Sequence, residues 1–500
     1  MPNTDALNAI QHVFVLMLEN RSFDHMFALS GINGIHAATT ADTNSVDGVT
    51  YHFQGGAPAV MPSDPSHGFC HVLTQLAGPG ADCSKTSPYP ARTNIGFVAD
   101  YAKTSVRSGP SQPKQPLPPA ERGKVMFGID TPNDAPALYT LAAEFALCDQ
   151  YYSSLPGPTW PNRFFVHGAS SDGMVEGPGL AEIAKWEALS GFKYPAGSIF
   201  DRVGAGNYRL YKDDVGPLVG RIPQVAALKG INFSEVHGLS NFAHDLANNY
   251  VARYTFIEPA YGDIVSDTYR GGSSQHPMDG LAAGDRLVAQ VYNAIRNSPI
   301  WESSLLIITY DEHGGFYDCG IPAHGAPPPG DGTGPHQNPH DFDFSVYGVR
   351  VPAVVVSPWI AKGVVDHTLY DHASVLATVE RLFGLAPLTQ RDGQARDMLG
   401  LLQGSARASS DTPSLLAETP VSLTAIELDG PPGPPDDELI PDGDKLQGYL
   451  FVARKAHREL EGPVAAMTLF QPVRTRGDAR RYLEEVVPQL EAARQSELPG

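Results

Sequence analysis

Four short apolar runs that do not alternate with polar residues predict buried strands. They span residues 12–18 (HVFVLML), 254–257 (YTFI), 304–309 (SLLIIT) and 351–356 (VPAVVV). Unbroken apolar runs of this length, rich in β-branched residues, are typical of strands that are covered on both faces of a parallel sheet. We therefore expect these four segments to be strands of a parallel α/β sheet.

Helical spacing of apolar residues appears between and after these runs. Residues 134–145 begin with an aspartate cap and an early proline, residues 279–297 repeat apolar side chains at helical spacing, and residues 371–383 are followed by Gly384, a suitable stop. Strands that alternate with helices favour an α/β fold, doubly wound, with a mostly parallel central sheet and helices on both faces.

The remaining segments divide the chain into a core of residues 1–404 and two additions. Within the core, residues 54–123 and 321–343 predict long loops, and residues 175–240 are a candidate cap insertion over the sheet. Residues 405–441 are polar and Pro-rich, which is typical of a linker or a draped segment. Residues 442–500 predict a helical C-terminal extension, with helices over 445–461 and 478–495 and a kink or an end at Pro488.

Charge and composition narrow the class of protein. The chain has 35 basic and 55 acidic residues, a net charge of −20, so it offers no basic field for nucleic acid or anionic lipid. It has no apolar run of membrane-spanning length and no signal-type stretch at its start. We expect a soluble, cytoplasmic protein, or a periplasmic or secreted one if a leader was removed, with its oligomeric state left open.

Cys70 and Cys83 could pair in an oxidising compartment, whereas Cys148 and Cys319 are expected as buried thiols.

Two acidic clusters follow predicted strands. Glu19 and Asn20 come directly after the first apolar run, and Asp311 and Glu312 follow the third. In open α/β sheets ligands bind at the carboxyl ends of the strands, and these oxygen donors suit a divalent cation. Taken alone, each cluster could be a helix cap or a solvated acidic turn. The repeated setting favours a shared cation, because adjacent carboxylates in a partly buried site need one to coexist.

A third candidate is the loop of residues 155–163 (LPGPTWPNR), which three prolines stiffen. A hydroxyl held beside a cation is a candidate nucleophile, here Thr159, and Asn162 and Arg163 could bind an anionic substrate. A lone Pro-rich loop is nevertheless more often structural, and a lone histidine is more often solvated or satisfied than catalytic. The candidate histidines are His67, His71, His276, His313 and His372. The sequence has no GxSxG, no P-loop and no GxGxxG that opens a helix after a strand.

Six ordered blocks resemble the motifs of the bacterial phosphoesterase family. They are HVFVLMLENRSFDHMF, LPGPTWPNR, QHPMDG, ITYDEHGGFYD, VRVPAVVVSPW and YDHASVLATVERLFGL, within residues 10–400. The family contains the non-zinc-type phospholipases C and an acid phosphatase, and it looks like a branch of the alkaline phosphatase superfamily. The resemblance implies an alkaline phosphatase-like fold, with residues 1–404 as a phosphoesterase catalytic domain.

The resemblance also assigns roles by motif. Glu19 and Asn20 match the first metal-binding pair and Asp311 and Glu312 the second, which implies one divalent ion: Mg²⁺, Mn²⁺, Ca²⁺ or Zn²⁺. Thr159 matches the hydroxyl nucleophile, which is Thr in phospholipase C relatives and Ser in the acid phosphatase. The other expected catalytic residues are His276 on the leaving-group side, His67 and His372, and the expected substrate-binding residues are Asn162, Arg163, His313 and His71, which also competes with His67.

The implied function is a metal-dependent phospholipase C-type hydrolysis of a phosphodiester, such as a phospholipid head group, through a phosphothreonine intermediate. The alternatives are an acid phosphatase acting on phosphomonoesters, a sulfatase-like or phosphonate-cleaving hydrolase, and a non-catalytic binding protein on the same scaffold. Two stretches depart from the family pattern: DCGIP replaces His-Val-Pro after the acidic block, and GFCHVLTQ replaces a Trp-rich stretch after DPSH. We expect a phosphate-ester substrate, no nucleic acid and no transmembrane segment.

Overall fold

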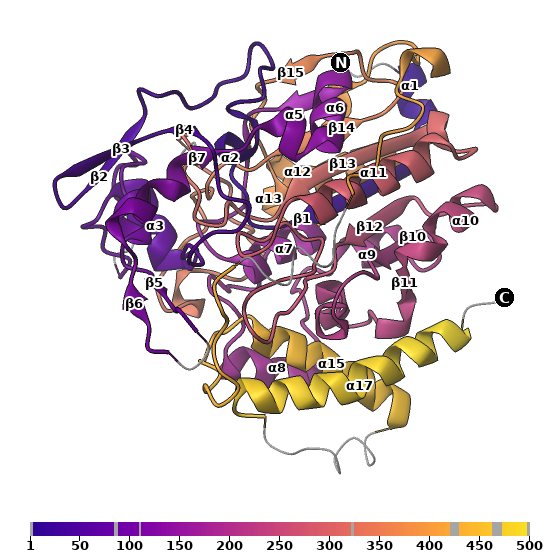
Figure 1. The fold of residues 1–500 in the computed structure, drawn as a ribbon. Helices are drawn as coiled ribbons and strands as arrows, with labels where there is room; N and C mark the ends of the chain where they lie inside the picture. Colours follow the sequence, from indigo (N-terminus) through magenta and orange to yellow (C-terminus); the bar gives the residue numbers. More distant parts are fainter. Residues whose placement is uncertain are drawn as a thin grey trace.

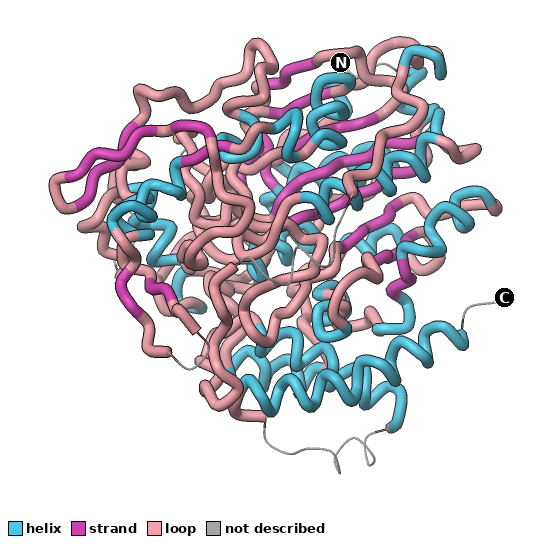
Figure 2. Tube along the Cα trace, in the orientation of Figure 1, coloured by secondary structure: helices cyan, strands magenta, loops and turns pink. Residues whose placement is uncertain are grey.

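An eight-stranded sheet runs through the centre of the protein (Figure 1; Figure 2). The computed structural model describes residues 4–84, 89–109, 112–321, 325–420, 430–462 and 473–497. In spatial order the strands are β11 (Val236–Gly238), β10 (Tyr208–Lys212), β12 (Tyr254–Glu258), β1 (His12–Leu18), β13 (Ser304–Tyr310), β14 (Ala353–Val356), β8 (Ala146–Cys148) and β15 (Val364–Asp366). The four predicted strands are β12, β1, β13 and β14, and they lie side by side at the centre.

The sheet is parallel except at β14. β1 pairs in parallel with both β12 and β13, and Leu18 lies opposite Tyr310. β14 runs antiparallel to both β13 and β8. An unbroken apolar run indicates burial on both faces and not strand direction, so the sequence could not show this reversal. The prediction of a mostly parallel α/β sheet is confirmed.

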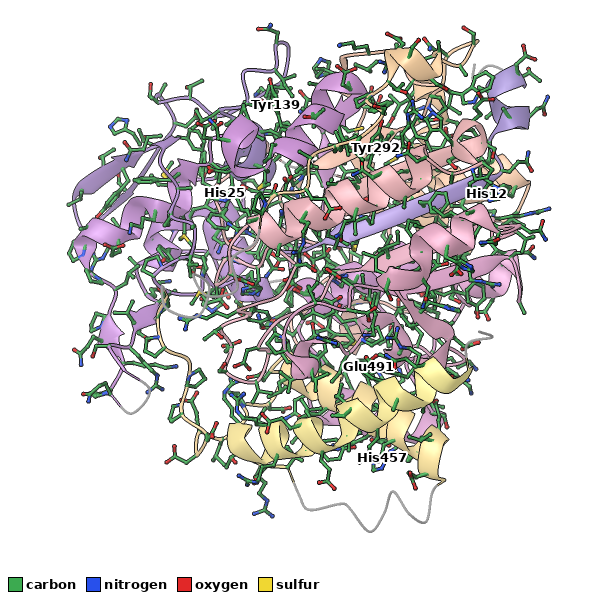
Figure 3. All side chains as sticks on the ribbon, turned by 45° about the vertical axis from the view of Figure 1, so that its right-hand side comes forward. His12, His25, Tyr139, Tyr292, His457 and Glu491 are labelled. Carbon is green, nitrogen blue, oxygen red and sulfur yellow. A yellow bond between two sulfur atoms is a disulfide. The ribbon has the colours of Figure 1, made fainter. Side chains whose placement is uncertain are left out.

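Helices cover both faces of the sheet (Figure 1). α6 (Pro136–Glu144) packs on α11 (Ala282–Arg296) on one face, and α7 (Thr159–Gly168) packs on α12 (His372–Phe383) on the other. Tyr292 projects from α11 to contact Phe145 and Trp301 (Figure 3). Gly384, with a φ of 66°, ends α12 as predicted.

The smaller elements complete the core. The other helices of the core are α1 (Thr4–Ala9), α2 (Phe23–Phe27), α3 (Phe69–Ala77), α4 (Phe97–Tyr101), α5 (Thr131–Asp134), α8 (Leu180–Leu189), α9 (Ile199–Val203), α10 (Phe242–Ala247) and α13 (Gln390–Gln394). Four two-stranded pairs are β2 (Thr43–Val46) with β3 (Val49–His52), β4 (Gln54–Gly55) with β7 (Phe127–Gly128), β5 (Ser105–Val106) with β6 (Gln115–Pro116), and β9 (Tyr151–Tyr152) with β16 (Tyr370–Asp371).

Residues 175–240 contribute to the sheet instead of forming a separate cap over it. β10 and β11 both lie in this segment and extend the sheet beyond β12. The sequence of β10 is YRLYK, and its first two residues are only partly buried. A search for unbroken apolar runs therefore missed this strand.

The C-terminal helices α15 (Leu446–Glu461) and α17 (Arg476–Glu497) pack on each other along one side of the core, next to α8 (Figure 1). His457 on α15 and Glu491 on α17 mark the pair in Figure 3. α17 continues past Pro488 instead of ending there, because Leu483, Val487 and Leu490 around it are buried and hold the helix in place. Residues 463–472 and 498–500 of the predicted extension lie outside the described residues.

The Pro-rich segment between core and extension is draped over the core. Arg296 of α11 donates to Thr412 Oγ1 (3.1 Å), and Arg107 pairs with Glu438 (2.7 Å). Residues 421–429 of this segment lie outside the described residues.

Cys70 and Cys83 form a disulfide, Cys148 is a buried thiol, and Cys319 is partly buried. Among the described residues, no helix combines the length and apolar character that a membrane crossing requires.

Candidate active site

The two acidic clusters meet at the carboxyl end of the sheet. β1 and β13 are parallel neighbours, so Glu19 and Asp311, which follow them, leave the sheet side by side. The backbone N–H of Asp311 donates to the Leu18 carbonyl (3.2 Å), and the backbone N–H of Asn20 donates to Asp311 Oδ1 (3.0 Å). Asn20 has a left-handed φ of 64°, which turns the chain at the end of β1. The predicted pairs Glu19–Asn20 and Asp311–Glu312 are both buried here.

Two glycines allow three segments to converge. At Gly314 (φ 62°) a Cβ would lie 2.1 Å from the Asn20 carbonyl oxygen, and at Gly315 (φ 73°) a Cβ would lie 2.6 Å from Pro65 Cβ. Only glycine tolerates both the left-handed backbone and this close approach. The acidic turn after β13 therefore contacts both the turn after β1 and the DPSH segment that carries His67.

Thr159 lies at the N-terminus of α7, beside the acidic clusters. Its side chain is buried, and its Oγ1 donates to Asn20 Oδ1 (3.2 Å). The N-terminus of a helix carries partial positive charge and free N–H groups, which favour a bound anion. The structure thus brings the predicted nucleophile together with the first predicted metal-binding pair.

Asn162, predicted to bind substrate, holds the Thr159 loop instead. Its Oδ1 accepts from the Leu155 backbone N–H (3.1 Å), and its Nδ2 donates to the Gly157 carbonyl (2.8 Å). The side-chain amide satisfies the backbone of the Pro-rich loop, so it fixes the position of Thr159 from inside the protein.

Arg163 is an internal counter-charge. Its Nε donates to Asp311 Oδ2 (3.0 Å), its Nη2 donates to the Leu18 carbonyl (3.1 Å), and its Nη1 lies 3.8 Å from Glu258. The side chain is only 2% exposed. Arg163 therefore neutralises Asp311 from behind, and the prediction that it meets an entering anion is not supported by its position.

Glu19 and Glu312 each keep a free carboxyl oxygen atom. Each is buried, and each has an Oε1 atom with no hydrogen-bond partner among the described residues. Burial, reinforced by the charge of Asp311, raises the pKa of Glu19 to about 8, and burial raises the pKa of Glu312 to about 8. Two buried carboxyl groups in this state fit a site whose negative charge a cation would neutralise.

His67 and His276 face the same site from the other side. His67 Nε2 lies 3.5 Å from Asn20 Nδ2, and the two imidazole centroids lie 6.2 Å apart. Together with Asp64, these two histidines form a group whose potential metal-ligand atoms all lie within 4.8 Å of one another. Among the described residues, the carboxylates of Glu19, Asp311 and Glu312 do not form such a group. Burial lowers the pKa of both imidazoles, so both are neutral near neutral pH.

His372 and His313 support the acidic cluster from behind. His372 Nε2 donates to the Asp311 carbonyl (2.6 Å), and its Nδ1 accepts from the Tyr151 hydroxyl (3.1 Å). His313 Nε2 donates to Gln75 Oε1 (2.7 Å), and its Nδ1 lies 3.3 Å from Glu312 Oε2. Both rings are buried and fully engaged, so they position Asp311 and Glu312.

His71 is not brought to this group of residues. Its side chain is 48% exposed, and its Nδ1 pairs with Asp100 Oδ1 (2.9 Å). Asp100 in turn accepts from the Gln75 side chain (2.9 Å). Of the two competing positions in the DPSH region, His67 is therefore the one that faces the site.

The site contains four further residues that the sequence patterns did not indicate: Glu258, Asp64, Tyr269 and Lys445. Glu258 ends β12 and could have been found by the criterion used for the other strands, an apolar run that stops at a carboxylate. Asp64 begins the DPSH segment. Tyr269 stacks on His276 (3.5 Å between centroids), and Lys445 Nζ lies 3.0 Å from His276 Nε2. No local pattern in the sequence marks the last two.

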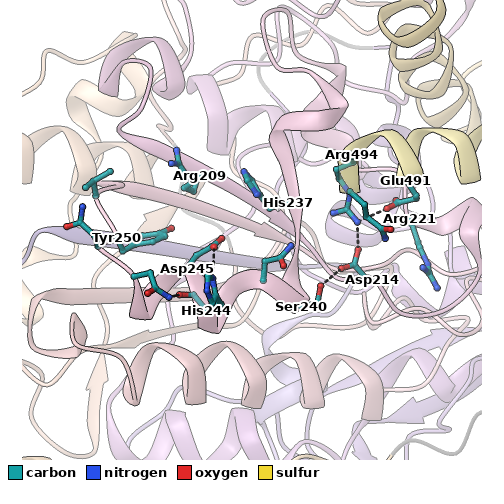
Figure 4. A pocket seen from close by; sticks show the side chains of 15 residues that line it. Arg209, Asp214, Arg221, His237, Ser240, His244, Asp245, Tyr250, Glu491 and Arg494 are labelled. Carbon is teal, nitrogen blue, oxygen red and sulfur yellow. Dashed lines mark hydrogen bonds and ion pairs between the residues drawn. The ribbon is translucent and has the colours of Figure 1, made fainter. Parts of the chain in front are cut away.

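An open cavity of about 970 Å³ lies elsewhere, between β10, α10 and α17 (Figure 4). Within it Arg494 is paired with Asp214 (3.1 Å) and with Glu491 (2.6 Å). None of the predicted site residues lines it. The candidate chemistry therefore lies at the end of the sheet and not in this cavity.

Glu258 gives a prediction about stability. Burial raises its pKa from 4.5 to about 7, so the stability that this protonated group contributes is present below about pH 4.5 and is lost as the pH rises through 7. Glu258→Gln stays neutral at every pH. Relative to wild type, its free energy of unfolding should therefore rise by roughly 2.5 kcal/mol between about pH 5 and pH 8.

Urea unfolding of both proteins at the two pH values measures this difference. Glu302 is an exposed glutamate, so Glu302→Gln serves as the control and should show no such change with pH. A difference between Glu258→Gln and wild type that is the same at both pH values would show that Glu258 is ionised throughout.

Comparison with known proteins identifies a family and sequence relatives of the chain. The model of the Phosphoesterase family matches residues 10–386. Non-specific phospholipase C6 of Arabidopsis thaliana is 33% identical over 463 residues, which cover 89% of this chain and 82% of that protein. Phospholipase C A of Mycobacterium tuberculosis is 28% identical over 455 residues, which cover 82% of this chain and 80% of that protein.

Solved structures give more distant matches. A protein in the alkaline phosphatase superfamily from Vibrio parahaemolyticus aligns over 56% of this chain and 66% of that one, with 11% identity and a TM-score of 0.29. The phosphonate monoester hydrolase of Agrobacterium radiobacter aligns over 54% and 72%, with 12% identity and a TM-score of 0.27. The family match and the sequence relatives show that the chain belongs to the phosphoesterase family and is a hydrolase of phosphoric ester bonds.

Proposed function

We propose that the protein is a metal-dependent phospholipase C-type enzyme that hydrolyses a phosphodiester through a phosphothreonine intermediate. One observation carries the proposal: the buried Thr159 hydroxyl, at the N-terminus of α7, donates to Asn20. Asn20 adjoins Glu19, and both Glu19 and Glu312 have a carboxyl oxygen with no partner among the described residues. A hydroxyl in this setting fits a nucleophile that attacks phosphorus.

Glu19, Asn20, Asp311 and Glu312 would hold the cation. Glu19 and Glu312 offer free oxygen atoms, and Asp311 Oδ2 has one lone pair left beside Arg163. An all-oxygen donor set favours Mg²⁺, Mn²⁺ or Ca²⁺ and leaves Zn²⁺ open. When bound, a divalent ion supplies positive charge for the phosphoryl oxygens and lowers the pKa of a nearby hydroxyl.

The reaction would proceed in two displacements. Thr159 Oγ1 would form a bond to phosphorus while the bond from phosphorus to the leaving alcohol breaks; the hydroxyl proton would pass to a neutral imidazole, and the departing oxygen would take a proton from water on the opposite face of phosphorus. His67 Nε2 is the candidate for this transfer. Water then attacks phosphorus, which restores the Thr159 hydroxyl and releases the phosphate monoester. Two in-line steps give net retention at phosphorus.

The choice of a phosphodiester rests on two points. The nucleophile is threonine, the residue implied for phospholipase C relatives, and the plant and mycobacterial relatives are themselves named phospholipases C. We take the substrate class, a phospholipid with a polar head group, from these relatives.

A comparison of two chromogenic substrates tests the proposal. We expect kcat/KM for p-nitrophenylphosphorylcholine to exceed that for p-nitrophenyl phosphate by about tenfold or more, since an acidic site accepts a monoanion more readily than a dianion. The reaction should also be inhibited by orthovanadate. Acid quenching during turnover, followed by peptide mass spectrometry, should find phosphate on Thr159.

The control outcomes separate the alternatives. A reversed substrate preference would assign the protein as a phosphatase for monoesters. Absence of turnover on both substrates and on phospholipid vesicles, with metal supplied, would favour the binding-protein alternative.

A further inference from the structure

The C-terminal extension reaches the active site through one side chain. Lys445, which precedes the first turn of α15, places Nζ 3.0 Å from His276 Nε2 and 3.9 Å from Asp64 Oδ2. The same ammonium lies 4.0 Å from the ring centroid of Tyr269, the ring that stacks on His276. Lys445 thus lies against the donor set of Asp64, His67 and His276.

The helix that carries Lys445 is seated beside the nucleophile. Gly448 packs so closely on Trp160 that a Cβ there would lie 2.3 Å from Trp160 Cζ2, and the Tyr449 ring meets Trp160 edge-on (5.5 Å). Residues three and four apart share one face of a helix, so Lys445, Gly448 and Tyr449 face the core together. Since Trp160 directly follows Thr159, packing fixes Lys445 relative to the nucleophile.

Lys445 is open to an entering ligand, whereas its histidine partner is not. The side chain of Lys445 is 20% exposed and that of Asp64 is 27% exposed, but His276 is fully buried. A pocket of about 390 Å³ lies beside them, lined by Asp64, Ser66 and Thr268 of the core and by Asp444 and Arg476 of the extension. Lys445 does not itself line this pocket, but it lies beside Asp64, which does, and its ammonium is partly exposed whereas His276 is fully buried.

The site needs an accessible cation for an anionic substrate. Arg163 is 2% exposed and already bonded to Asp311. Lys445 Nζ donates to a neutral imidazole, and its contact with Asp64 is long, so it keeps hydrogen-bonding capacity for a phosphoryl oxygen. The Lys445 ammonium also supplies positive charge beside Asp64, His67 and His276. Without it, a second metal ion would have to provide that charge.

We propose that Lys445 is a phosphate-binding residue on the leaving-group side of the site, and that the C-terminal helices serve to deliver it. This inference rests on the proposed function, because the anion it binds is the phosphoryl group of the ester substrate. The extension is therefore part of the active site and not an added packing or oligomerisation module.

Variants of the metal-loaded full chain test the inference, with inorganic phosphate as the probe. Lys445→Met should raise the dissociation constant of phosphate, measured by titration calorimetry, by about 10–100-fold, the range for loss of a charge-assisted hydrogen bond. Lys445→Arg should keep it within about threefold, because the charge remains. Lys445→Met should leave the Tm near that of wild type and raise KM for p-nitrophenylphosphorylcholine.

Lys455 provides the matched control on the same helix. It is a buried lysine whose Nζ donates to the carbonyls of Ala226 (2.9 Å) and Leu228 (3.3 Å), away from the site. Lys455→Met should lower the Tm and leave phosphate affinity unchanged, which is the opposite pattern to Lys445→Met. A purely structural role for Lys445 would give the two variants the same pattern.

The outcomes separate this inference from the proposed function. An unchanged phosphate affinity in Lys445→Met overturns the inference, even if the wild type hydrolyses phosphodiesters. So does a second divalent ion in the wild-type chain that Asp64→Asn loses, because the donor set would then hold a metal. If phosphate affinity depends on Lys445 but the wild type cleaves no ester, the proposed function fails and the binding role stands.

Discussion

Thr159→Ala is expected to lower kcat on p-nitrophenylphosphorylcholine by about 10³-fold or more, because it removes the oxygen that attacks phosphorus. Thr159→Ser keeps that oxygen and should retain measurable turnover. The Thr159 side chain is small, and its hydroxyl makes one hydrogen bond, to Asn20, so both variants should remain folded. Steady-state kinetics, together with thermal melting of each protein, measure the two effects separately.

Thr140→Ala is the matched control. Thr140 lies on α6, partly buried, and its hydroxyl donates to the Pro136 carbonyl (2.8 Å). This variant should keep the wild-type kcat. If Thr159→Ala also kept near wild-type turnover, the phosphothreonine route would have to be abandoned, whatever the substrate.

Removal of the metal is expected to have the second largest effect. Chelation should lower kcat by about 10²-fold or more, since the phosphoryl oxygens would face Glu19 and Glu312 without a neutralising charge. It should also lower the Tm, because a ligand at 100 times its Kd stabilises the folded state by about 2.7 kcal/mol. Activity and Tm are measured before and after chelation, and again after Mg²⁺, Mn²⁺, Ca²⁺ or Zn²⁺ is added singly.

A pair of glutamate variants locates the effect. Glu312→Gln should abolish the rise in Tm on adding the effective metal. Glu380→Gln should keep it, because Glu380 is a buried glutamate of α12 whose neighbour is Asp392 and not the candidate metal site. Equal activity and Tm with and without chelator in the wild type would contradict metal dependence.

Periodicity and burial predicted the centre of the fold well. The runs at 12–18 and 304–309 became β1 and β13, and the acidic residues after them converge because parallel strands end together. The helix predicted over 371–383 became α12 with the expected glycine at its end. These successes share one cause, which is that burial on both faces leaves a strong local signal.

Features that depend on distant contacts left no such signal. The direction of β14 depends on its neighbours, β13 and β8, and the short, partly polar strand β10 lacks an apolar run. Arg163 looked like an anion ligand because its charge is visible in the sequence and its partner Asp311 is not adjacent. Lys445 lies far along the chain from every motif, and the packing of α15 on Trp160 brings it to the site.

The order of the sheet has a consequence for how the protein is made. β1 leaves the ribosome early, yet both of its partners, β12 and β13, come more than about 240 residues later, roughly 12–50 s at about 5–20 residues per second. During that interval the apolar residues 13–18 have no strand beside them, a state prone to aggregation. Synthesis should therefore depend on a chaperone that shields this strand, and refolding in its absence should be slow, with losses that grow with protein concentration.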